Sequence, residues 1–206
     1  MPDGCLIAFD AEFVSVEVEN VVMDSTGQRI VHDEGRQVVG RVSLLDGRRK
    51  EGVKDSSCQN GREEQTLLLD DYVLPTEPVV DYVTRFSGLV EEDLNPATSR
   101  HAVVSDRTAY LKLRYYRDSG CIFVGHGLQK DFETANIFVP PEQIRDTVEL
   151  WRLPNMRKIS LRFLASYLLH MEIQDDIHDS IEDARTALIL YRHYEDTLSA
   201  GETRLQ

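Results

Sequence analysis

The sequence predicts an α/β fold in which a mixed β-sheet is flanked by α-helices. Residues 1–74 contain three apolar runs typical of strands, whereas helical and strand patterns alternate from Ser99 onward. Strands followed by alternating helices and strands indicate one mixed sheet covered by helices, and they disfavour a sandwich or a helical bundle. With 206 residues and 41% hydrophobic content, we expect residues 1–206 to form a single domain with a sizeable core.

Nearly continuous apolar side chains predict the first three strands, at residues 5–16, 37–45 and 66–74. Short connections would join these strands into a meander. The intervening residues, 17–34 and 46–65, are rich in Gly, Ser, Asp and Arg. That composition is typical of mobile surface loops, so residues 17–65 are expected to contain variable insertions.

The later elements are predicted from hydrophobic periodicity and length. In chain order we expect a helix at 99–118, a buried strand at 121–125, a helix at 128–138, a short strand at 147–151, and helices at 159–169 and 181–198. Ligands of α/β sheets usually bind where the chain leaves a strand for a helix. Polar residues at those places are therefore the first candidates for function.

Composition disfavours several classes of protein. No apolar run approaches the roughly 20 residues of a membrane-spanning helix. The three cysteines are widely spaced and include no CxxC pair, which favours neither a disulfide framework nor a zinc site and fits a reducing compartment. The net charge of −13 disfavours a broad surface for duplex nucleic acid, but it is compatible with a metal-loaded site that takes a short single strand.

Two acids interrupt the first apolar strand. Asp10 and Glu12 are two residues apart, so their side chains project from one face, which Leu6, Ala8 and Val14 share. Paired carboxylates on an apolar face repel each other and lose hydration, and a divalent cation relieves both effects. The alternative, which this spacing leaves open, is a strand end where both acids point into water.

A third acid follows the glycine turn after the buried strand. Asp131 falls in the helix row of Leu128, Ala135 and Phe138, which is otherwise apolar. An inward-facing acid there is a candidate ligand, although a first-turn acid that interacts with the helix dipole explains the residue equally well. His126 in the turn is either a substrate contact or a histidine bonded to backbone.

A histidine and a fourth acid open the last predicted helix. Asp183 begins an inward row that continues through Ala187 and Leu190. His178 comes just before this helix, and the ordinary histidine pKa of about 6.5 suits a general base. The structural alternative is a capping box, in which Ser180 caps the helix and Asp183 replaces the usual Glu or Gln.

In this order and spacing, the Asp-x-Glu pair, the Asp after a Gly-His turn and the late His-x4-Asp resemble the DEDD exonucleases of the histidine-bearing subclass. Each motif is weak by itself, and the combination is specific. Further segments resemble the nuclease domains of poly(A)-nuclease deadenylases: Asp70-Asp71-Tyr72, Arg85-Phe86-Ser87-Gly88-Leu89 and Tyr110-Leu111-Lys112-Leu113-Arg114. The resemblance covers nearly the whole chain and is weakest over residues 17–65.

The resemblance implies an RNase H-like fold and a 3′-to-5′ exoribonuclease that shortens the poly(A) tail of messenger RNA and releases AMP. It implies that two Mg²⁺ ions, or Mn²⁺, are held by Asp10, Glu12, Asp131 and Asp183, with His178 as the general base. It further implies a single-stranded RNA substrate, a cytoplasmic location, more domains upstream, and a regulatory partner subunit in a deadenylase complex.

Substrate contacts are predicted less directly. Phe13, next to Glu12, and Leu89, in the Ser-Gly-Leu turn, are candidates for touching the terminal base, as apolar and aromatic side chains do in single-strand binding. Both residues also suit the core. The most basic local stretch comprises Arg152, Arg157, Lys158 and Arg162. It either tracks RNA or forms a solvated helix face or a partner surface.

Three other functions stay open from the residues alone. A DNA-directed 3′-to-5′ exonuclease would use the same site and would differ in whether it recognises the sugar 2′-hydroxyl. A catalytically inactive RNA-binding or scaffold module would usually have lost at least one of the five site residues. A calcium-binding structural domain would need a compact loop of closely spaced oxygen ligands, which this sequence lacks.

Overall fold

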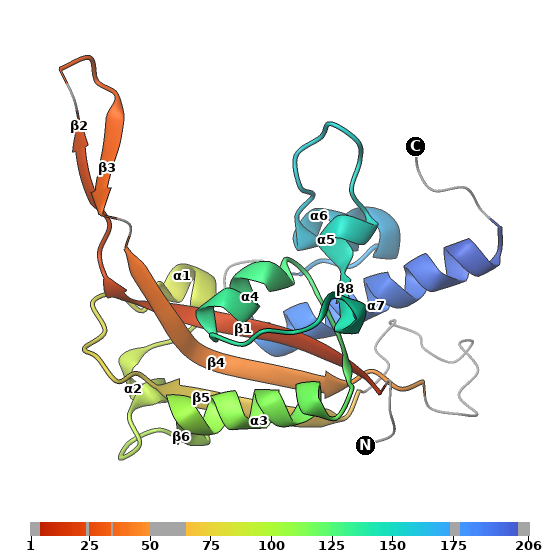
Figure 1. Ribbon diagram of the computed structural model, residues 1–206, viewed down its shortest axis with the longest axis horizontal. Coiled ribbons are helices and arrows are strands. Elements are labelled where there is room, and N and C mark those ends of the chain that lie inside the picture. Colours follow the sequence, from red (N-terminus) through yellow and green to blue (C-terminus); the bar gives the residue numbers. More distant parts are fainter. Residues whose placement is uncertain (1–4, 24, 34, 50–64, 174–177, 202–206) are drawn as a thin grey trace.

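The fold is known from a computed structural model, which describes residues 5–23, 25–33, 35–49, 65–173 and 178–201 (Figure 1). Within these residues a six-stranded sheet has the order β6-β5-β4-β1-β7-β8. Its strands are β1 (Leu6–Glu17), β4 (Arg36–Asp46), β5 (Leu67–Leu74), β6 (Val103–Ser105), β7 (Ile122–Gly125) and β8 (Ile144–Asp146). The β1, β4 and β5 strands pair antiparallel and the other neighbours pair parallel, so the predicted mixed sheet and its N-terminal meander are confirmed.

Helices flank this sheet, as predicted (Figure 1). Those of the described residues are α1 (Thr84–Ser87), α2 (Glu91–Leu94), α3 (Asp106–Asp118), α4 (Leu128–Thr134), α5 (Thr147–Leu150), α6 (Leu161–Leu169) and α7 (Ser180–Ser199), with a 3-10 turn at Pro141–Gln143. The sequence pattern located α6 and α7 within two residues of their ends, and it missed the four-residue helices α1 and α2.

The two faces of β1 pack against different helices. On one face α3 and α4 cover the main core, where the ring of Phe9 stacks on Phe132 of α4 with centroids 5.5 Å apart. On the other face Ala8 packs against Ala184 and Leu188 of α7, and α6 in turn packs against α7. Successive side chains of a strand point to opposite faces, so β1 can bury both of its sides.

The predicted helix at 99–118 begins too early. Helix α3 begins at Asp106, because the side chain of Ser105 accepts a hydrogen bond from the Thr108 N–H at 3.2 Å and caps the helix. The preceding residues, Val103–Ser105, extend along β5 as the edge strand β6. The sheet therefore gains a parallel strand that the helical pattern concealed.

Two further elements differ from their predicted bounds. Helix α4 ends at Thr134 rather than at residue 138, since Asn136 adopts a left-handed conformation (φ 50°) and Phe138 is 74% exposed. The strand predicted at 147–151 is wrong. Thr147–Leu150 form helix α5, because its N-cap Asp146 accepts a hydrogen bond from the Val148 N–H at 2.9 Å. The strand β8 lies immediately before this helix.

Part of the predicted insertion has regular structure. Strands β2 (Asn20–Met23) and β3 (Arg29–Asp33) pair antiparallel in a hairpin that projects away from the main sheet (Figure 1). Residues 50–64, the other part of the insertion, lie outside the described residues. The assignment of residues 1–206 to one domain stays a prediction. In the part of the chain that the structure describes, no helix combines the length and apolar character needed to cross a bilayer.

Candidate active site

Strand β1 carries Asp10 and Glu12 on the face that α7 covers. On the same face Ala8 packs against α7, and Val14 packs in a separate cluster with Leu89. The predicted sharing of one apolar face by both acids is confirmed. The register between β1 and β4 shifts just after Glu12, where Gly40 is an extra residue on β4. Such bulges often redirect side chains beside active sites.

Helix α7 brings a third acid to this strand. The N-cap is Asp179, whose carboxylate accepts hydrogen bonds from the N–H groups of Ile181 and Glu182 at 2.9 and 3.2 Å. The capping-box alternative therefore places the cap one residue too late, because Ser180 is the first residue of the helix. Asp183 is left to turn inward and is 5% exposed.

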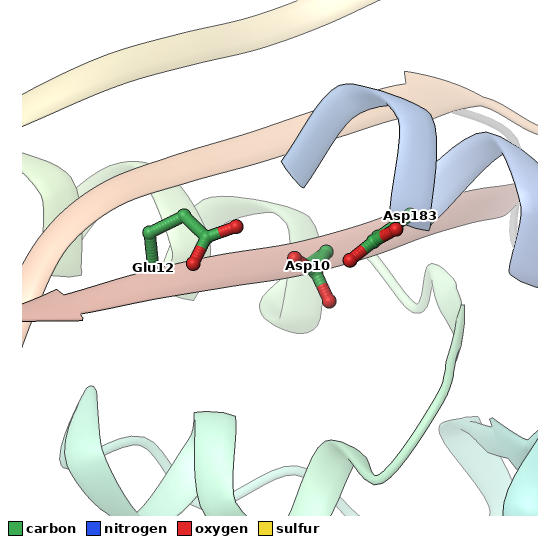
Figure 2. A group of neighbouring side chains, drawn as sticks. All are labelled: Asp10, Glu12 and Asp183. Carbon is green, nitrogen blue, oxygen red and sulfur yellow. The ribbon is translucent and has the colours of Figure 1, made fainter. Parts of the chain in front are cut away.

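The carboxyl groups of Asp10, Glu12 and Asp183 form one acidic group, in which β1 supplies two members and α7 the third (Figure 2). Each residue offers an oxygen atom, and these atoms all lie within 4.8 Å of one another. Burial, and then the charges of Asp131, Asp183 and Glu12, raise the pKa of Asp10 well above its usual range. Burial and the charge of Asp183 raise the pKa of Glu12 to about 9, although Arg41 acts in the opposite direction.

This acidic group has the donor chemistry of a divalent cation site. Carboxylate oxygens are hard ligands of the kind that Mg²⁺ and Mn²⁺ accept. The raised pKa values mean that the three carboxyl groups resist being charged together in this partly buried position. A bound cation would remove that repulsion, so the residues present fit a metal.

Asp131 approaches the same strand from α4. Its carboxylate accepts a hydrogen bond from the Ala11 N–H of β1, and burial raises its own pKa to about 7. After burial, the charge of Asp131 has the largest effect in raising the pKa of Asp10. Asp131 is outside the group of three defined above, but its charge acts on the Asp10 carboxyl group.

Two features hold α4 in that position. The carboxylate of Asp146 accepts hydrogen bonds from the N–H groups of Gly127 and Leu128 at 2.8 and 3.0 Å. Gly125 ends β7 so close to β1 that a Cβ atom there would lie 2.6 Å from the carbonyl oxygen of Phe9. A side chain at residue 125 would therefore push α4, and Asp131 with it, away from β1.

His178 lies beside Asp183, just before α7. The imidazole Nδ1 is 3.5 Å from Asp183 Oδ2, and the imidazole and the Phe86 ring are in a T-shaped arrangement with centroids 6.2 Å apart. Burial lowers the pKa of His178 below its usual value, which keeps the ring neutral near pH 7. A neutral imidazole beside an acidic group can accept a proton from a water molecule bound there.

A family model described as an exonuclease, of the RNase T type, matches residues 55–191. This chain belongs to the RNase T exonuclease family. The matched region includes Asp131, His178 and Asp183, and it begins after Asp10 and Glu12. Individual relatives are similar to this chain over nearly its whole length, including the N-terminal strand that carries Asp10 and Glu12.

One relative is the PAN2-PAN3 deadenylation complex catalytic subunit PAN2 of Cryptococcus neoformans var. neoformans serotype D. It is 48% identical over 200 residues, which make up 97% of this chain and 16% of that protein. The protein of the same name from Homo sapiens is 43% identical over 198 residues, or 96% of this chain and 16% of that protein. The chain thus spans about 16% of the length of these relatives.

A solved structure shares the fold. The pseudoubiquitin hydrolase-RNA exonuclease module of Saccharomyces cerevisiae Pan2, in complex with A7 RNA, superimposes with a TM-score of 0.80 and 39% identity. The alignment covers 97% of this chain and 30% of that one. The predicted fold class, an RNase H-like mixed sheet flanked by helices, is thereby confirmed.

The three residues that the sequence predicted as substrate contacts lie in different surroundings. Phe13 points to the face opposite Glu12 and packs against the main core, with Lys130 Nζ 5.1 Å from its ring. Leu89 is 2% exposed and packs against Val14, which favours the core alternative. Both ring nitrogens of His126 are hydrogen-bonded within the protein: Nδ1 lies 2.9 Å from Thr147 Oγ1, and Nε2 lies 3.1 Å from the Ile159 carbonyl oxygen. This favours the alternative of a histidine bonded to backbone.

The basic stretch remains on the surface. Arg152, Arg157, Lys158 and Arg162 are exposed, and Arg152 pairs with Glu149 at 3.1 Å. This pairing fits the solvated-face alternative for Arg152.

Two residues beside the site were not among the predicted ones. Arg41 is buried on β4 opposite Glu12, and Phe86 on α1 is 58% exposed next to His178. The pairing register that brings Arg41 to Glu12 cannot be obtained from periodicity. Phe86 lies three residues before Leu89 in a matching segment, in which the sequence interpretation singled out Leu89 and not Phe86.

Proposed function

We propose that this chain is the nuclease domain of a deadenylase, a metal-dependent 3′-to-5′ exoribonuclease that shortens poly(A) tails and releases AMP. The observation that carries the proposal is the convergence of Asp10, Glu12 and Asp183, whose ligand oxygens lie within 4.8 Å of one another. Asp131 and His178 border this group from two other segments.

The four acids would hold two divalent ions, Mg²⁺ or alternatively Mn²⁺. Bound ions of this kind activate a water molecule and stabilise the oxygen that leaves the phosphodiester. Asp10 would contribute most, because its pKa responds to the charges of Glu12, Asp131 and Asp183.

His178 would act as the general base. Asp183 lies beside Nδ1 of the imidazole, which leaves Nε2 to accept the proton of the water that attacks the last phosphodiester. Burial lowers the pKa of His178, so the base is available in its neutral form at physiological pH. Asp183 would also orient the ring.

The substrate would be a single strand of RNA that enters with its 3′ end. The exposed ring of Phe86, which lies beside His178, is of the kind that stacks on bases, and the guanidinium of Arg85 lies 5.8 Å from the same ring. Poly(A) is favoured because two similar proteins are named catalytic subunits of a deadenylation complex and a similar structure contains A7 RNA.

The setting of the domain is part of the same proposal. Since the chain spans about 16% of its relatives, residues 1–206 would form a single catalytic domain within a larger cytoplasmic protein. A regulatory subunit of the deadenylase complex would recruit messenger RNA to it.

The test is digestion of 5′-labelled RNA that ends in oligo(A), compared with RNA of mixed 3′ sequence, in Mg²⁺ and in EDTA. We expect stepwise shortening with AMP as the product, faster on oligo(A), and none in EDTA. Asp10→Asn should lower the rate at least about a hundredfold. Asp118→Asn, at an exposed acid paired with Arg114 and Arg117, should not.

Oligo(dA) provides the decisive comparison with a DNA-directed exonuclease. Faster digestion of oligo(dA) than of oligo(A) would mean that the substrate is DNA and not RNA. The assignment of the metal site would still hold. Full activity in EDTA, or in the Asp10→Asn variant, would refute the assignment of the site.

A further inference from the structure

Arg41 is a buried cation beside the acidic group. It lies opposite Glu12 in the β1–β4 register, and its side chain is 10% exposed. Its guanidinium donates two hydrogen bonds to Asp70 of β5, from Nε to Oδ1 at 2.7 Å and from Nη2 to Oδ2 at 3.2 Å. This two-bond geometry fixes the plane of the guanidinium as well as its position.

The same guanidinium reaches the start of α7. Its Nη1 lies 3.4 Å from Oδ2 of Asp179, while Oδ1 of Asp179 accepts the N–H groups of Ile181 and Glu182. One carboxylate therefore both caps α7 and meets Arg41. The contact joins the segment between His178 and Asp183 to the sheet.

A second contact runs in parallel with the first. The hydroxyl groups of Ser43 on β4 and Ser180 on α7 lie 2.7 Å apart, and both residues are fully buried. Ser43 also donates to Asp70 Oδ1 at 3.2 Å. Asp70 thus accepts hydrogen bonds from both Arg41 and Ser43. The two side chains that contact α7 are therefore held by one carboxylate on β5.

Lysine could not replace this arrangement. The guanidinium uses three of its nitrogens toward two carboxylates on different elements, and its central carbon lies 5.0 Å from the centre of the Tyr72 ring. A lysine ammonium is a point charge without the planar fork that makes these contacts together.

We propose that Arg41 is a positioning residue of the active site: through Asp70 and Asp179 it fixes the first turn of α7 over β1, so that His178 and Asp183 face Asp10 and Glu12. The inference rests on the proposed function for its effect on catalysis. Its effects on metal binding and on α7 are independent of any substrate.

Arg36 provides a matched control on the same strand. It also pairs with two carboxylates, those of Glu17 and Glu77, but its side chain is 43% exposed and it lies at the far end of β4, toward the β2–β3 hairpin. Exposed ion pairs contribute little to stability. Arg36→Gln therefore removes an arginine with similar partners and leaves the α7 contact untouched.

The experiment compares the wild-type chain with the Arg41→Lys, Arg41→Gln and Arg36→Gln variants by three measurements. These are Mg²⁺ affinity by calorimetry, amide hydrogen exchange of Ile181 and Glu182 without metal, and kcat and KM on oligo(A). We expect Arg41→Lys to weaken Mg²⁺ binding and to lower kcat, each about 10- to 100-fold, with KM little changed and faster exchange at both amides. Arg36→Gln should match the wild type.

A Lys variant with wild-type Mg²⁺ affinity and wild-type amide exchange would overturn the proposal. If Arg41→Gln fails to fold, Asp179→Asn supplies the second test, because asparagine keeps the cap but loses the charge that Arg41 meets. In a double-mutant cycle with Arg41→Lys, the losses of Mg²⁺ affinity should be less than additive. Additive losses would also overturn it.

The result is separable from the proposed function. If the wild-type chain does not digest RNA but the Arg41 variants weaken Mg²⁺ binding and loosen α7, the positioning inference stands and the proposed nuclease activity falls. If the wild type digests oligo(A) and Arg41→Lys equals it in Mg²⁺ affinity, amide exchange and kcat, only the positioning inference falls.

Discussion

The acids of the candidate site occupy positions that their neighbours make apolar. Asp10 and Glu12 share a strand face with Ala8, and Asp183 precedes the buried residues Ala184 and Ala187 on α7. Without a cation these side chains oppose folding, because burial and mutual repulsion penalise the charged forms. Their presence is explained if a bound cation compensates for that cost.

The stability of the metal-free chain and the stabilisation that metal adds should therefore change with pH in opposite directions. The pKa of Glu12 is raised to about 9 and that of Asp131 to about 7, whereas unfolded acids titrate near 4. Between these values the folded, metal-free chain holds more protons than the unfolded chain, so its free energy of unfolding falls as pH rises from about 4 to about 9. In Mg²⁺ the stabilisation by metal should grow over the same range, because the ligands must be deprotonated. Thermal unfolding in EDTA and in Mg²⁺ measures both trends.

Glu12→Gln is the matched variant for that measurement. It removes the carboxyl group whose pKa is raised to about 9 and keeps every histidine and cysteine, so the difference between the two proteins isolates Glu12. In EDTA the variant should gain stability over the wild type as pH rises from 7 to 9. Equal pH dependence of the two proteins would contradict the raised pKa of Glu12.

His178 should affect the reaction rather than metal binding. His178→Gln is expected to lower kcat by about 10²- to 10⁴-fold, with Mg²⁺ affinity nearly unchanged because the imidazole is not a proposed ligand. Burial lowers the pKa of His178, so the rate of the wild type should rise with pH through a midpoint below about 6.5, and this acidic limb should vanish in the variant. Rate measurements from pH 5 to 8 test both statements.

His193→Gln is the control for this substitution. His193 is exposed, stacks on Trp151 and follows Asp183 by ten positions on α7, a distance of about 15 Å along the helix. Its variant should keep the wild-type rate and acidic limb. An acidic limb that persists in His178→Gln would assign the base to another group.

At the level of elements, sequence pattern succeeded where an element has one clear periodicity. The apolar run around Asp10 located β1, and the two-residue spacing of Asp10 and Glu12 predicted that they share a face. The row through Asp183 and Ala187 located α7 and its inward side. Both elements are long, so local pattern and tertiary burial agree over many residues.

Pattern failed where a short element is decided by its cap. Thr147–Leu150 reads as an apolar strand, but Asp146 caps it as a helix. Phe138 continues the row of α4 in sequence, but the left-handed Asn136 turns the chain first. Contacts between strands were equally inaccessible: Arg41 lies opposite Glu12 through a pairing register that periodicity does not fix, and that register shifts at Gly40 just after this pair.

The β2–β3 hairpin should be dispensable for the fold. Glu17 and Arg36 are paired neighbours at the ends of β1 and β4, and an ion pair joins their side chains at 3.2 Å. Replacing residues 18–35 with an Asn-Gly turn would therefore close β1 and β4 directly. We expect the free energy of unfolding to change by less than about 1 kcal/mol, as for other exposed changes, with Mg²⁺ affinity unaltered.

Denaturant unfolding and calorimetry on the shortened chain test this expectation. A shorter chain exposes less surface on unfolding, so the m-value should fall slightly while the transition stays cooperative. Loss of a single cooperative transition, or weaker Mg²⁺ binding, would mean that the hairpin supports the end of the sheet that carries Glu12.

For the whole molecule, net charge limits how RNA can be held. A charge of −13 repels the phosphate backbone over most of the surface, and only local cations or bound metal can reverse that field. Contact should then be confined to the few nucleotides nearest the site. Stacking of bases, as proposed on Phe86, would supply affinity that does not depend on charge.

The dependence of RNA binding on salt measures the number of phosphates held. For single strands the slope of log K against log salt is about −0.7 for each neutralised phosphate, so three or fewer contacts predict a slope no steeper than about −2. The measurement is the affinity of the Asp10→Asn variant for oligo(A) across a range of KCl concentrations at fixed Mg²⁺.

Arg157→Gln, added to the Asp10→Asn variant, tests the basic stretch. An unchanged slope assigns Arg157 to a solvated face, whereas a slope shallower by about 0.7 assigns it to the RNA path. A slope of about −5 for the Asp10→Asn chain with Arg157 intact would contradict the short footprint, because it requires about seven phosphates and hence an extended basic track.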